Sequence, residues 1–524
     1  MTSKIRIATR ALGLGLAGSA FFALARDELP DKIYDVKKGL GLLTRNEEEK
    51  KQRVVVLGSG WGALSFVQRL DQTKFDVVVV SPRSFFFYTP LLAGVATGTV
   101  NFSSITESMR WHLGQLSSPP SFLQAHATSV DFANQAVTCS TPRDPATGAP
   151  SVATTLDYDH LVVAVGAEPS TFGIPGVAEH AHMMKEVSDS LTVQQRLLSS
   201  LEYASALAAS NGPGEGEVER EVNRTLHWVV VGGGPTGVEL TAELCDFRNE
   251  DIAKYFPGIS DRIRITLVEG TSKVLGTFSP HISTYAKDAL VGAGAEVMTD
   301  QFVTGVTERK ITLKAAKDKS TSNLEYGIMV WAGGIAARPF TKKLAADIGG
   351  EQVLNLGRGG VRGLKVDSKF RVLGARNVWA LGDCALSGCA PTAQAAYQQG
   401  KYLGRLFRDS GLRGGGEGGV DEAEPFEFMN YGSLAYVGSS KGVADLKMHL
   451  WGDDAPAGRG QDNTIIEGTA AFGIWRSLYF SKMLSLRNRL QVVTDWTIGS
   501  LFGREISTPW DVSGEPAAAG DRKK

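Results

Sequence analysis

Short apolar runs, each followed by a polar or glycine-rich turn, recur along the chain. Strands of a parallel sheet are buried on both faces, so they occur as continuous apolar segments rather than as alternating ones. The runs are separated by stretches long enough for a crossover helix, such as the helix expected over residues 188–208. This pattern predicts an α/β fold with parallel sheets. The candidate strands are residues 54–57, 77–80, 161–165, 229–231, 263–268, 328–331 and 378–381.

Polar and glycine-rich segments mark the expected connections. Residues 142–151 indicate a polar loop, residues 211–216 a flexible linker, and residues 414–419 an exposed glycine loop.

Near the end of the chain, apolar residues recur at three- and four-residue steps, which predicts one apolar face of a single helix. The aromatic residues in it, and Arg476, Lys482, Arg487 and Arg489 around it, suit a membrane interface with anionic headgroups. A helix packed on the protein's own core, or at a dimer contact, is equally consistent with the periodicity. The residues of this face are Trp475, Leu478, Tyr479, Met483, Leu486, Leu490 and Val493, with Trp496 beyond them.

Two glycine fingerprints follow two of the expected strands. In such a motif the first glycine forms the tight turn from strand to helix, and the second lets the backbone approach a pyrophosphate. A third small residue lets the helix pack on the strand, and the helix N-terminus offers free N–H groups to phosphate. Two motifs predict two dinucleotides in one protein. The three positions are Gly58, Gly60 and Ala63 in one motif and Gly232, Gly234 and Gly237 in the other.

The end of the next strand bears on the choice of dinucleotide. Glu269 ends the strand after the second fingerprint, and a carboxylate there accepts hydrogen bonds from ribose hydroxyls and repels a 2′-phosphate, which favours NADH over NADPH. It follows Gly232 by 37 residues (269 − 232), against a usual ~20, and we attribute the excess to an insertion around residues 246–261. The alternative is an ordinary exposed glutamate. The first unit has no acid at this point, where the sequence is Ser81-Pro82-Arg83.

Glycines also end the later strands. Gly166 follows one strand, and Ala332-Gly333 repeats the design after another. Gly382-Asp383 follows the strand 378–381, and an aspartate there binds the ribityl and phosphate region of the flavin in two-dinucleotide flavoproteins. A structural cap on the next helix is the alternative for Asp383.

The composition is that of a folded protein of two or three domains. The chain has 524 residues, 43% hydrophobic and 21% charged, and a net charge of −1, so nothing indicates nucleic-acid binding. The four cysteines are too few for a disulfide framework and lack the spacing of a zinc site. Cys384 and Cys389 are more simply interpreted as structural thiols than as a redox pair, and we expect no metal site.

Residues 1–26 differ from the rest. Lys4, Arg6 and Arg10 precede an apolar stretch over residues 11–25, and no acid occurs before Asp27. The segment is typical of a mitochondrial presequence, but its Ala-Leu-Ala end is equally typical of a secretory cleavage site. The stretch is shorter than the ~20 residues that a spanning helix needs, and no later stretch qualifies.

These motifs resemble those of the type II NADH:quinone oxidoreductases, the alternative, rotenone-insensitive NADH dehydrogenases of mitochondria and bacteria. The resemblance covers about residues 52–510. Members of this family also have a serine, as at Ser81 here, at the end of the strand after the first fingerprint, where other dinucleotide-binding proteins have an acid. The specific stretches are residues 81–92, the second fingerprint through Glu239, residues 379–383, and Ala393-Gln394-Ala395-Ala396-Tyr397-Gln398, which matches the quinone-site motif of the family.

The resemblance implies FAD as cofactor, and NADH and ubiquinone as substrates. It implies that Thr89-Pro90 lies by the isoalloxazine ring, Ala332-Gly333 lies near the nicotinamide, and Gln394 and Gln398 form the quinone pocket. Glu239 could reach the flavin edge and relay a proton; an ordinary helix glutamate is the alternative. The other residues expected to bind FAD are Gly58, Gly60, Ala63, Ser81, Pro82, Arg83, Gly166, Gly382 and Asp383, and those expected to bind NADH are Gly232, Gly234, Gly237 and Glu269.

The order of the motifs predicts two Rossmann-like dinucleotide-binding domains, one inserted in the other, plus a C-terminal membrane-anchoring region. The chain would leave the FAD domain near Pro175 and return to it by residue 362. The expected bounds are residues 1–50 for a presequence and lead-in, 51–175 and 346–425 for the FAD domain, 176–345 for the NADH domain, and 426–524 for a membrane-anchoring or dimerisation region.

The implied activity is oxidation of NADH with two-electron reduction of ubiquinone, without proton pumping, at the mitochondrial inner membrane, on a face left open. A homodimer is also expected. Sulfide:quinone oxidoreductases and disulfide reductases need redox cysteines near the flavin, and none lies between Val54 and Ala125. The alternative is a flavoprotein like apoptosis-inducing factor, which acts through association.

Overall fold

The computed structural model describes residues 51–116, 119–144, 147–209, 215–354, 360–409, 418–447, 463–483 and 485–506. The expected presequence and lead-in lie outside this range, as do most of the expected linker 211–216 and of the glycine loop 414–419. Of that linker, Glu215 and Gly216 begin a helix, α8 (Glu215–Thr225).

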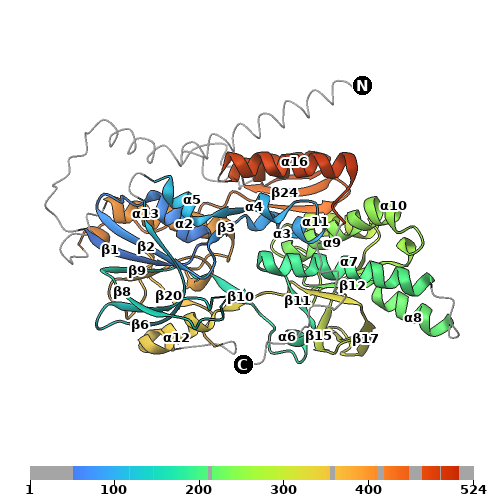
Figure 1. The fold of residues 1–524 in the computed structure, drawn as a ribbon, viewed down its shortest axis with the longest axis horizontal. Coiled ribbons are helices and arrows are strands. Elements are labelled where there is room, and N and C mark those ends of the chain that lie inside the picture. Colours follow the sequence, from blue (N-terminus) through green and yellow to red (C-terminus); the bar gives the residue numbers. More distant parts are fainter. Residues whose placement is uncertain are drawn as a thin grey trace, which may run out of the picture.

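A parallel sheet of five strands, in the order β21-β9-β1-β2-β5, forms the first unit (Figure 1). Helices α2 (Trp61–Arg69) and α13 (Ala393–Asp409) pack on one face, with Phe66 and Phe407 in ring contact at 5.3 Å. An antiparallel meander, β6-β7-β8, packs on the other face. The strands are β1 (Gln52–Leu57), β2 (Phe75–Ser81), β5 (Ser121–Gln124), β6 (His126–Asp131), β7 (Ala136–Ser140), β8 (Ala153–Asp157), β9 (His160–Val163) and β21 (Val378–Ala380).

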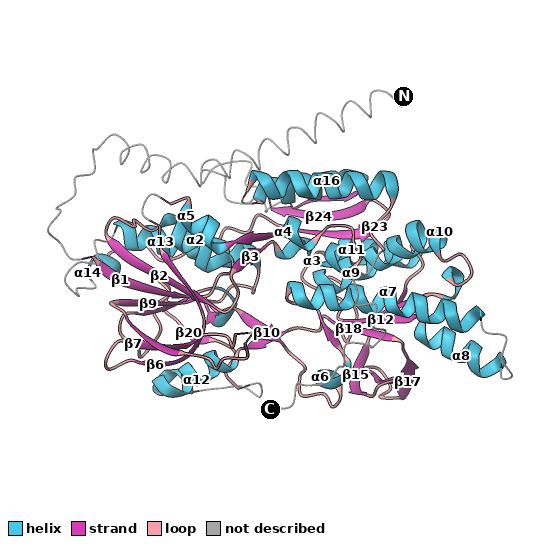
Figure 2. Ribbon diagram, in the orientation of Figure 1, coloured by secondary structure: helices cyan, strands magenta, loops and turns pink. Residues whose placement is uncertain are grey.

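The second unit repeats this design (Figure 2). Its parallel sheet has the order β11-β18-β12-β13-β14, helices cover one face, and the meander β15-β16-β17 packs on the other. The elements are β11 (His182–Met183), α7 (Val187–Ala209), β12 (His227–Val231), α9 (Pro235–Phe247), β13 (Arg264–Val268), α11 (Pro280–Gly292), β14 (Glu296–Met298), β15 (Gln301–Val306), β16 (Lys310–Ala315), β17 (Thr321–Glu325) and β18 (Ile328–Trp331).

The chain forms four strands of the first sheet, then the whole second unit, and then adds β21 to the first sheet. The crossings pair as an antiparallel ribbon of β10 (Ala167–Pro169) and β19 (Ile335–Ala337). Helix α12 (Pro339–Ile348) already contributes Leu344 to the core of the first unit. The predicted α/β fold with parallel sheets is therefore confirmed.

The C-terminal part forms a separate layer against the second unit. Its antiparallel sheet of β23 (Ser433–Gly438), β24 (Lys441–Lys447) and β25 (Asn463–Gly468) packs beside α9 and α11, and helices α15 (Thr469–Lys482) and α16 (Leu486–Phe502) follow. The remaining elements are β3 (Phe85–Phe87), η1 (Thr89–Leu91), α3 (Leu92–Ala96), α4 (Phe102–Ile105), β4 (Thr106–Ser108), α5 (Met109–Gly114), α6 (Val177–His180), η2 (Arg248–Ile252), α10 (Ala253–Tyr255), η3 (Ser260–Arg262), η4 (Gly350–Gln352), β20 (Leu364–Lys365), η5 (Gly382–Cys384), β22 (Ala385–Leu386) and α14 (Gly418–Asp421).

The prediction of one helix with one apolar face after Trp475 is wrong. The chain breaks between α15 and α16, where the Ser485 hydroxyl accepts a hydrogen bond from the N–H of Asn488 and so caps the second helix. The face divides at this break: Trp475 and Met483 are buried, whereas Leu486 and Leu490 are exposed. Within the described residues, no helix is both long enough and apolar enough to span a bilayer.

Candidate functional site

Both first glycines turn the chain tightly against the next strand of their sheet. Gly58 has a φ of +123°, and a Cβ there would lie 2.2 Å from the carbonyl oxygen of Ala164. Gly232 has a φ of +113°, and a Cβ there would lie 2.4 Å from the oxygen of Ala332. The turn of each motif therefore touches the end of the adjacent strand, next to the glycine that follows it.

The second glycines face open space at the start of a helix. Gly60 and Gly234 are the N-cap residues of α2 and α9, and a Cβ on either would meet no protein atom within 4 Å. Neither helix has a side-chain cap or an acid in its first turn. Free N–H groups at a helix N-terminus favour an anion. We call each glycine turn with the helix N-terminus behind it a cradle, the first at Gly58–Gly60 and the second at Gly232–Gly234. Both cradles fit the pyrophosphate of a dinucleotide.

Glu269 lies directly beside the second cradle. Its Oε2 accepts a hydrogen bond from the N–H of Gly233 at 2.5 Å, and its Oε1 accepts one from the N–H of Thr271 at 2.7 Å. The residues between α9 and β13 form the short helices η2, α10 and η3, which account for the long spacing. These two hydrogen bonds hold the carboxylate at the glycine turn, beside the N-terminus of α9.

In the first unit, Ser81 is buried and cannot act as an exposed ribose ligand. Its hydroxyl lies 2.9 Å from that of Ser59 in the glycine turn and accepts the N–H of Arg83 at 3.2 Å. The carbonyl oxygen of Pro82 accepts a hydrogen bond from the side-chain amide of Gln124 at 3.2 Å. These contacts hold the fingerprint loop against the end of β2.

The Arg83 guanidinium lies between the two units. It is 2.5 Å from the carboxylate of Glu186, which also pairs with Arg338 at 3.2 Å, and it lies 4.6 Å from the centre of the Phe87 ring. Burial lowers the pKa of Arg83, and Glu186 opposes this. The guanidinium stays close to the first cradle as a fixed cation.

The Gly382-Asp383 turn ends β21 beside the first fingerprint. Asp383 pairs with the ammonium of Lys185 at 3.2 Å, and the N–H of Gly382 donates to the side chain of Gln399 at 2.7 Å. Gln399 is buried and also donates to Ser387. Gln399 could not be predicted from the sequence, because only the packing of α13 against this turn shows its role.

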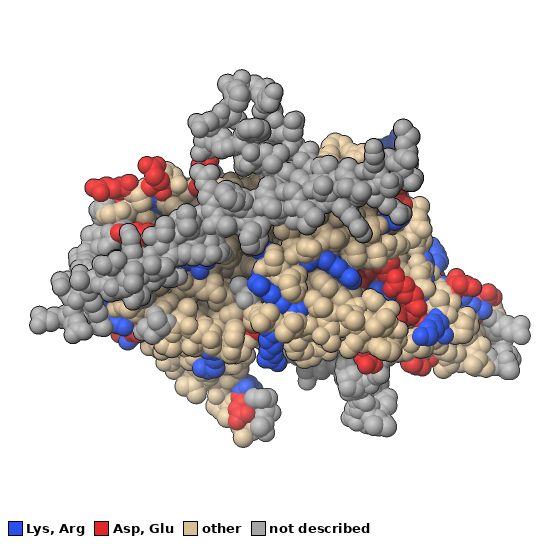
Figure 3. All heavy atoms as spheres, turned by 90° about the horizontal axis from the view of Figure 1, so that it is seen from above, with Lys and Arg blue, Asp and Glu red and all other residues tan. Residues whose placement is uncertain are grey.

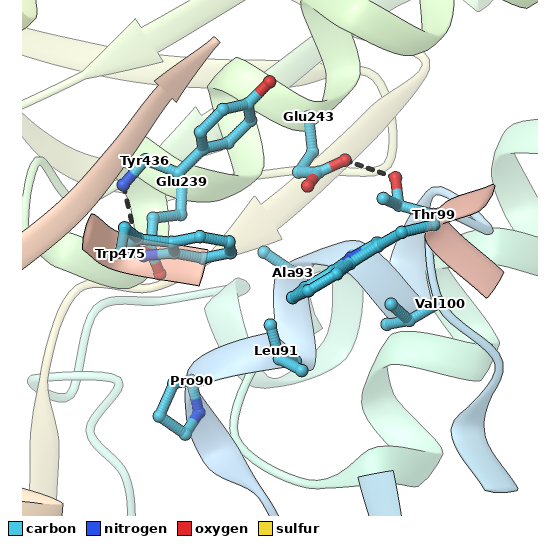
Figure 4. Close-up of a pocket in the computed structure, with 11 residues that line it drawn as sticks. Pro90, Leu91, Ala93, Thr99, Val100, Glu239, Glu243, Tyr436 and Trp475 are labelled. Atoms are coloured by element: carbon cyan, nitrogen blue, oxygen red, sulfur yellow. Dashed lines mark hydrogen bonds between the residues drawn. The ribbon is translucent and has the colours of Figure 1, made fainter. Parts of the chain in front are cut away.

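A small cavity lies where the two units meet the C-terminal layer. Figure 4 shows Glu239 and Glu243 of α9 on one side of it and Pro90 and Leu91 of η1 on the other. Thr89, next to Pro90, accepts a hydrogen bond from the Trp61 indole at 3.0 Å. The structure therefore brings together two segments that the sequence singled out, Thr89-Pro90 and Glu239. The other lining residues are Ala93, Gly94, Thr99, Val100, Tyr436, Trp475 and Trp496.

Glu239 is 8% exposed and acts as an acceptor on one oxygen. Its Oε1 receives the N–H of Tyr436 at 3.2 Å and the indole N–H of Trp475 at 3.4 Å. Burial raises its pKa to about 8, and Glu243 adds to the rise. A carboxyl with this pKa holds and releases a proton near neutral pH.

The glutamines of α13 are both engaged with the segment that leads into the C-terminal layer. The Gln398 amide donates to the oxygen of Met429 at 2.8 Å and accepts its N–H at 3.0 Å, and Gln394 accepts the N–H of Tyr431 at 3.4 Å. The two side chains share one helix face, as their spacing predicts. The two glutamines therefore lie together, one helical turn apart. Their hydrogen bonds hold α13 against the segment at residues 429–431, a structural role that the motif does not indicate.

The cysteines are free, and Cys384 is buried with its thiol directed at the Val163 and Leu381 carbonyl oxygens. Burial raises the pKa of Cys384 to about 11. Over the part of the chain that the structure describes, no group of His, Cys, Asp or Glu side chains could hold a metal ion.

The chain matches two family models. Residues 52–400 match the pyridine nucleotide-disulphide oxidoreductase family, and residues 431–505 match the NDH2 C-terminal domain. The external alternative NADH-ubiquinone oxidoreductase of Yarrowia lipolytica mitochondria is 36% identical over 497 residues, with 88% of this chain and 81% of that protein covered. The external NADH-ubiquinone oxidoreductase 2 of Saccharomyces cerevisiae is 34% identical over 481 residues, with 87% and 82% covered.

Solved structures agree with these relatives. The structure of NDH2 from Plasmodium falciparum in complex with NADH superposes with a TM-score of 0.76 at 26% identity and covers 88% of this chain and 100% of that chain. A sulfide:quinone oxidoreductase from Aquifex aeolicus, at 14% identity and a TM-score of 0.59, shares the fold.

Proposed function

Because the chain belongs to the pyridine nucleotide-disulphide oxidoreductase family, and within it to the type II NADH dehydrogenases, we propose that it binds FAD in its first unit and NADH in its second. The chain is an NADH–ubiquinone oxidoreductase of the alternative type. We assign the quinone pocket to Gln394 and Gln398, and we keep the domain bounds expected from the sequence except that α12 belongs to the FAD domain, because Leu344 lies in the core of the first unit.

The observation that carries the proposal is the pair of open cradles at Gly60 and Gly234. Each lies at the N-terminus of a helix, and only the second has a carboxylate, Glu269, at the end of the neighbouring strand. That asymmetry supports NADH in the second unit. In the first unit, Asp383 and the Ser81-Pro82-Arg83 segment lie around the cradle and fit FAD.

The Gly58–Gly60 turn and Asp383 would hold FAD, which would supply the two-electron redox chemistry between NADH and a quinone. The protein holds the two substrates in position and excludes water. The quinone must also gain two protons, and the Glu239 carboxyl can donate one because its pKa lies near 8. Proton pumping is not part of this mechanism.

NADH oxidation by the FAD-loaded protein, with and without short-chain ubiquinone, tests the proposal. We expect fast quinone-dependent turnover in the wild type. In Gln394→Ala, we expect the quinone-dependent rate to fall roughly 5- to 150-fold, since loss of a hydrogen bond in a closed site costs roughly 1–3 kcal/mol, while NADH still bleaches the flavin. Bleaching without any quinone dependence in the wild type would favour the alternative, a flavoprotein that acts through association.

Glu269→Gln is expected to relax the selectivity for NADH over NADPH about tenfold, measured as the ratio of their kcat/KM values. The amide oxygen can still accept the N–H of Gly233, but the charge that repels a 2′-phosphate is gone. Glu296→Gln, an exposed change on the neighbouring strand β14, is the matched control. Unchanged selectivity in Glu269→Gln would remove Glu269 from the ribose site.

We further propose that α16 attaches the protein to a membrane surface, the mitochondrial inner membrane. Its outer side carries apolar side chains that are between 42% and 70% exposed. Figure 3 views the molecule from this side, and the described surface visible there is mostly uncharged, with both Lys and Arg and Asp and Glu side chains on it. Burying even three of the apolar side chains would contribute on the order of 5 kcal/mol. They are Leu486, Leu490, Val493, Ile498, Leu501 and Phe502.

Leu490→Asp is expected to weaken binding to vesicles of phosphatidylcholine and phosphatidylserine at least about tenfold, because the charge must be taken into the interface. Leu354→Asp is the matched control, because Leu354 is 57% exposed and Leu490 58%. Co-flotation with the vesicles measures binding. Equal flotation of the two variants would argue against α16 as the attachment face.

Homodimerisation through the C-terminal region stays a prediction.

A further inference from the structure

Helix α9 carries three buried carboxylates in a row, and the mechanism above uses only the first. Glu239, Glu243 and Asp246 follow at spacings of four and three residues, so they lie along one face of the helix. Because Glu239 is 8% exposed, each proton it donates must be replaced along some route from solvent.

The second carboxylate, Glu243, accepts hydrogen bonds from two hydroxyls, of which only that of Thr99 is partly exposed. Its Oε2 accepts the hydroxyl of Thr99 at 2.5 Å and that of Thr97 at 3.1 Å. Glu243 is 7% exposed, whereas Thr99 is partly exposed. Figure 4 shows the Thr99 contact at the edge of the cavity. Thr99 therefore joins a buried acid to solvent.

The cavity joins the two glutamates to each other. Both side chains line it, one helical turn apart, together with the Trp475 indole and Thr99 (Figure 4). Residues four apart on a helix have Cβ atoms about 5–6 Å from each other, so both carboxyl groups reach the same cavity, and a water held between two polar groups bridges them. The cavity lining is largely apolar, but the two carboxylates and the Thr99 hydroxyl supply the polar partners that a buried water needs.

We propose that Thr99 and Glu243 deliver protons from solvent to Glu239. The Thr99 hydroxyl gives its proton to the Glu243 carboxylate and takes one from water, and Glu243 passes a proton through a cavity water to the carboxylate that Glu239 becomes after donation. No electron moves in these steps, and each oxygen that loses a proton regains one. The inference rests on the proposed function, in which Glu239 protonates the quinone.

Arg504, beyond the end of α16, sets the direction of the hydroxyl. Its Nε donates to the Thr99 oxygen at 2.9 Å, and its Nη2 lies 3.9 Å from the Glu243 carboxylate. The Thr99 proton can then point at Glu243, at 2.5 Å, or at the Thr97 hydroxyl, at 3.1 Å, and the shorter contact is the one to Glu243. Arg504 is itself fixed by Asp251 at 2.5 Å and Glu250 at 2.9 Å. The other charged or titratable groups around Glu243 are Glu239 and Asp246 on its own helix, Tyr436 on β23 and Arg476 on α15.

Rapid-mixing experiments on the FAD-loaded full-length protein test the relay. Glu243→Gln and Thr99→Val should leave anaerobic flavin reduction by NADH unchanged. They should slow reoxidation by short-chain ubiquinone about tenfold or more, raise its solvent deuterium isotope effect, and be partly rescued by added formic acid. Asp246→Asn is the matched control: it is the next buried acid on the same face, bonded to Tyr436 and Ser439 but outside the cavity lining, and should reoxidise at the wild-type rate.

Wild-type reoxidation rates in both Glu243→Gln and Thr99→Val would overturn the relay and leave the proposed function standing. Slow reoxidation with an unchanged isotope effect and no rescue would also overturn it, because that result reports a packing defect. A wild type that quinone does not reoxidise would instead refute the proposed function. If Glu243→Gln fails to fold, Thr99→Val decides alone, since its isosteric change lies at the partly exposed end of the route.

Discussion

Replacing Gly234 by alanine is expected to weaken NADH binding about 100-fold while the FAD content and the unfolding temperature of the NADH-free protein stay at wild-type values. The added methyl group meets no protein atom within 4 Å, and the φ of −71° suits alanine. It would occupy the space through which the backbone approaches a pyrophosphate. Loss of one or two hydrogen bonds to a charged group costs about 1.5–3 kcal/mol each, which gives this magnitude. Titration of the FAD-loaded protein with NADH, in the absence of quinone, measures it.

Gly60→Ala is the equivalent change in the first fingerprint and is the control, because its methyl group also meets no protein atom within 4 Å. It should reduce FAD retention instead. Gly232→Ala should destabilise the second unit outright, since its Cβ would lie 2.4 Å from the Ala332 oxygen. If Gly234→Ala and Gly60→Ala impaired the same ligand, the assignment of the two cradles to two different dinucleotides would be wrong.

The parallel strands could be predicted from the sequence, because a strand that is buried on both faces is a continuous run of apolar residues. Residues 54–57 and 77–80 are continuous apolar runs, and the structure has β1 and β2 over them. The antiparallel meanders were not predicted, because strands such as β6 (His126–Asp131) are half-exposed and too short to show a clear alternation. The same holds for the C-terminal sheet.

The features that were missed depend on contacts between distant segments. The apolar spacing continues across Ser485, but the N–H of Ser485 donates to Glu107 at 3.1 Å, and the Asn488 amide donates to the Ser104 oxygen at 2.9 Å. These bonds turn α16 away from α15. They join segments far apart in the chain, so the spacing of apolar residues around Ser485 does not predict them. Glu243 was missed for a similar reason. Acids four residues apart on a helix usually line a solvated face, and only the cavity distinguishes this pair.

Glu239→Gln is expected to slow ubiquinone reduction about 100-fold, at the lower end of the range for loss of a general acid, and to leave flavin reduction by NADH unchanged. In the wild type, burial raises the pKa of Glu239 from 4.5 to about 8, so the carboxyl carries its proton at neutral pH. Quinone reduction by the wild type should therefore fall as the pH rises through about 8. The residual activity of Glu239→Gln should lack this step, and steady-state turnover with short-chain ubiquinone between pH 6 and 9 measures both.

The same raised pKa gives a test that needs no turnover. A group that binds its proton more tightly in the folded protein stabilises it fully below the unfolded pKa of 4.5, and this contribution is lost as the pH rises through about 8. Glutamine has no charge to bury, so Glu239→Gln should gain in unfolding temperature relative to the wild type between pH 5 and 9. Asp246→Asn should also gain in unfolding temperature, because burial raises the pKa of Asp246, but without the loss of quinone reduction. A flat difference in unfolding temperature for Glu239→Gln would mean that Glu239 is ionised in the folded protein, and it could not then be the proton donor at neutral pH.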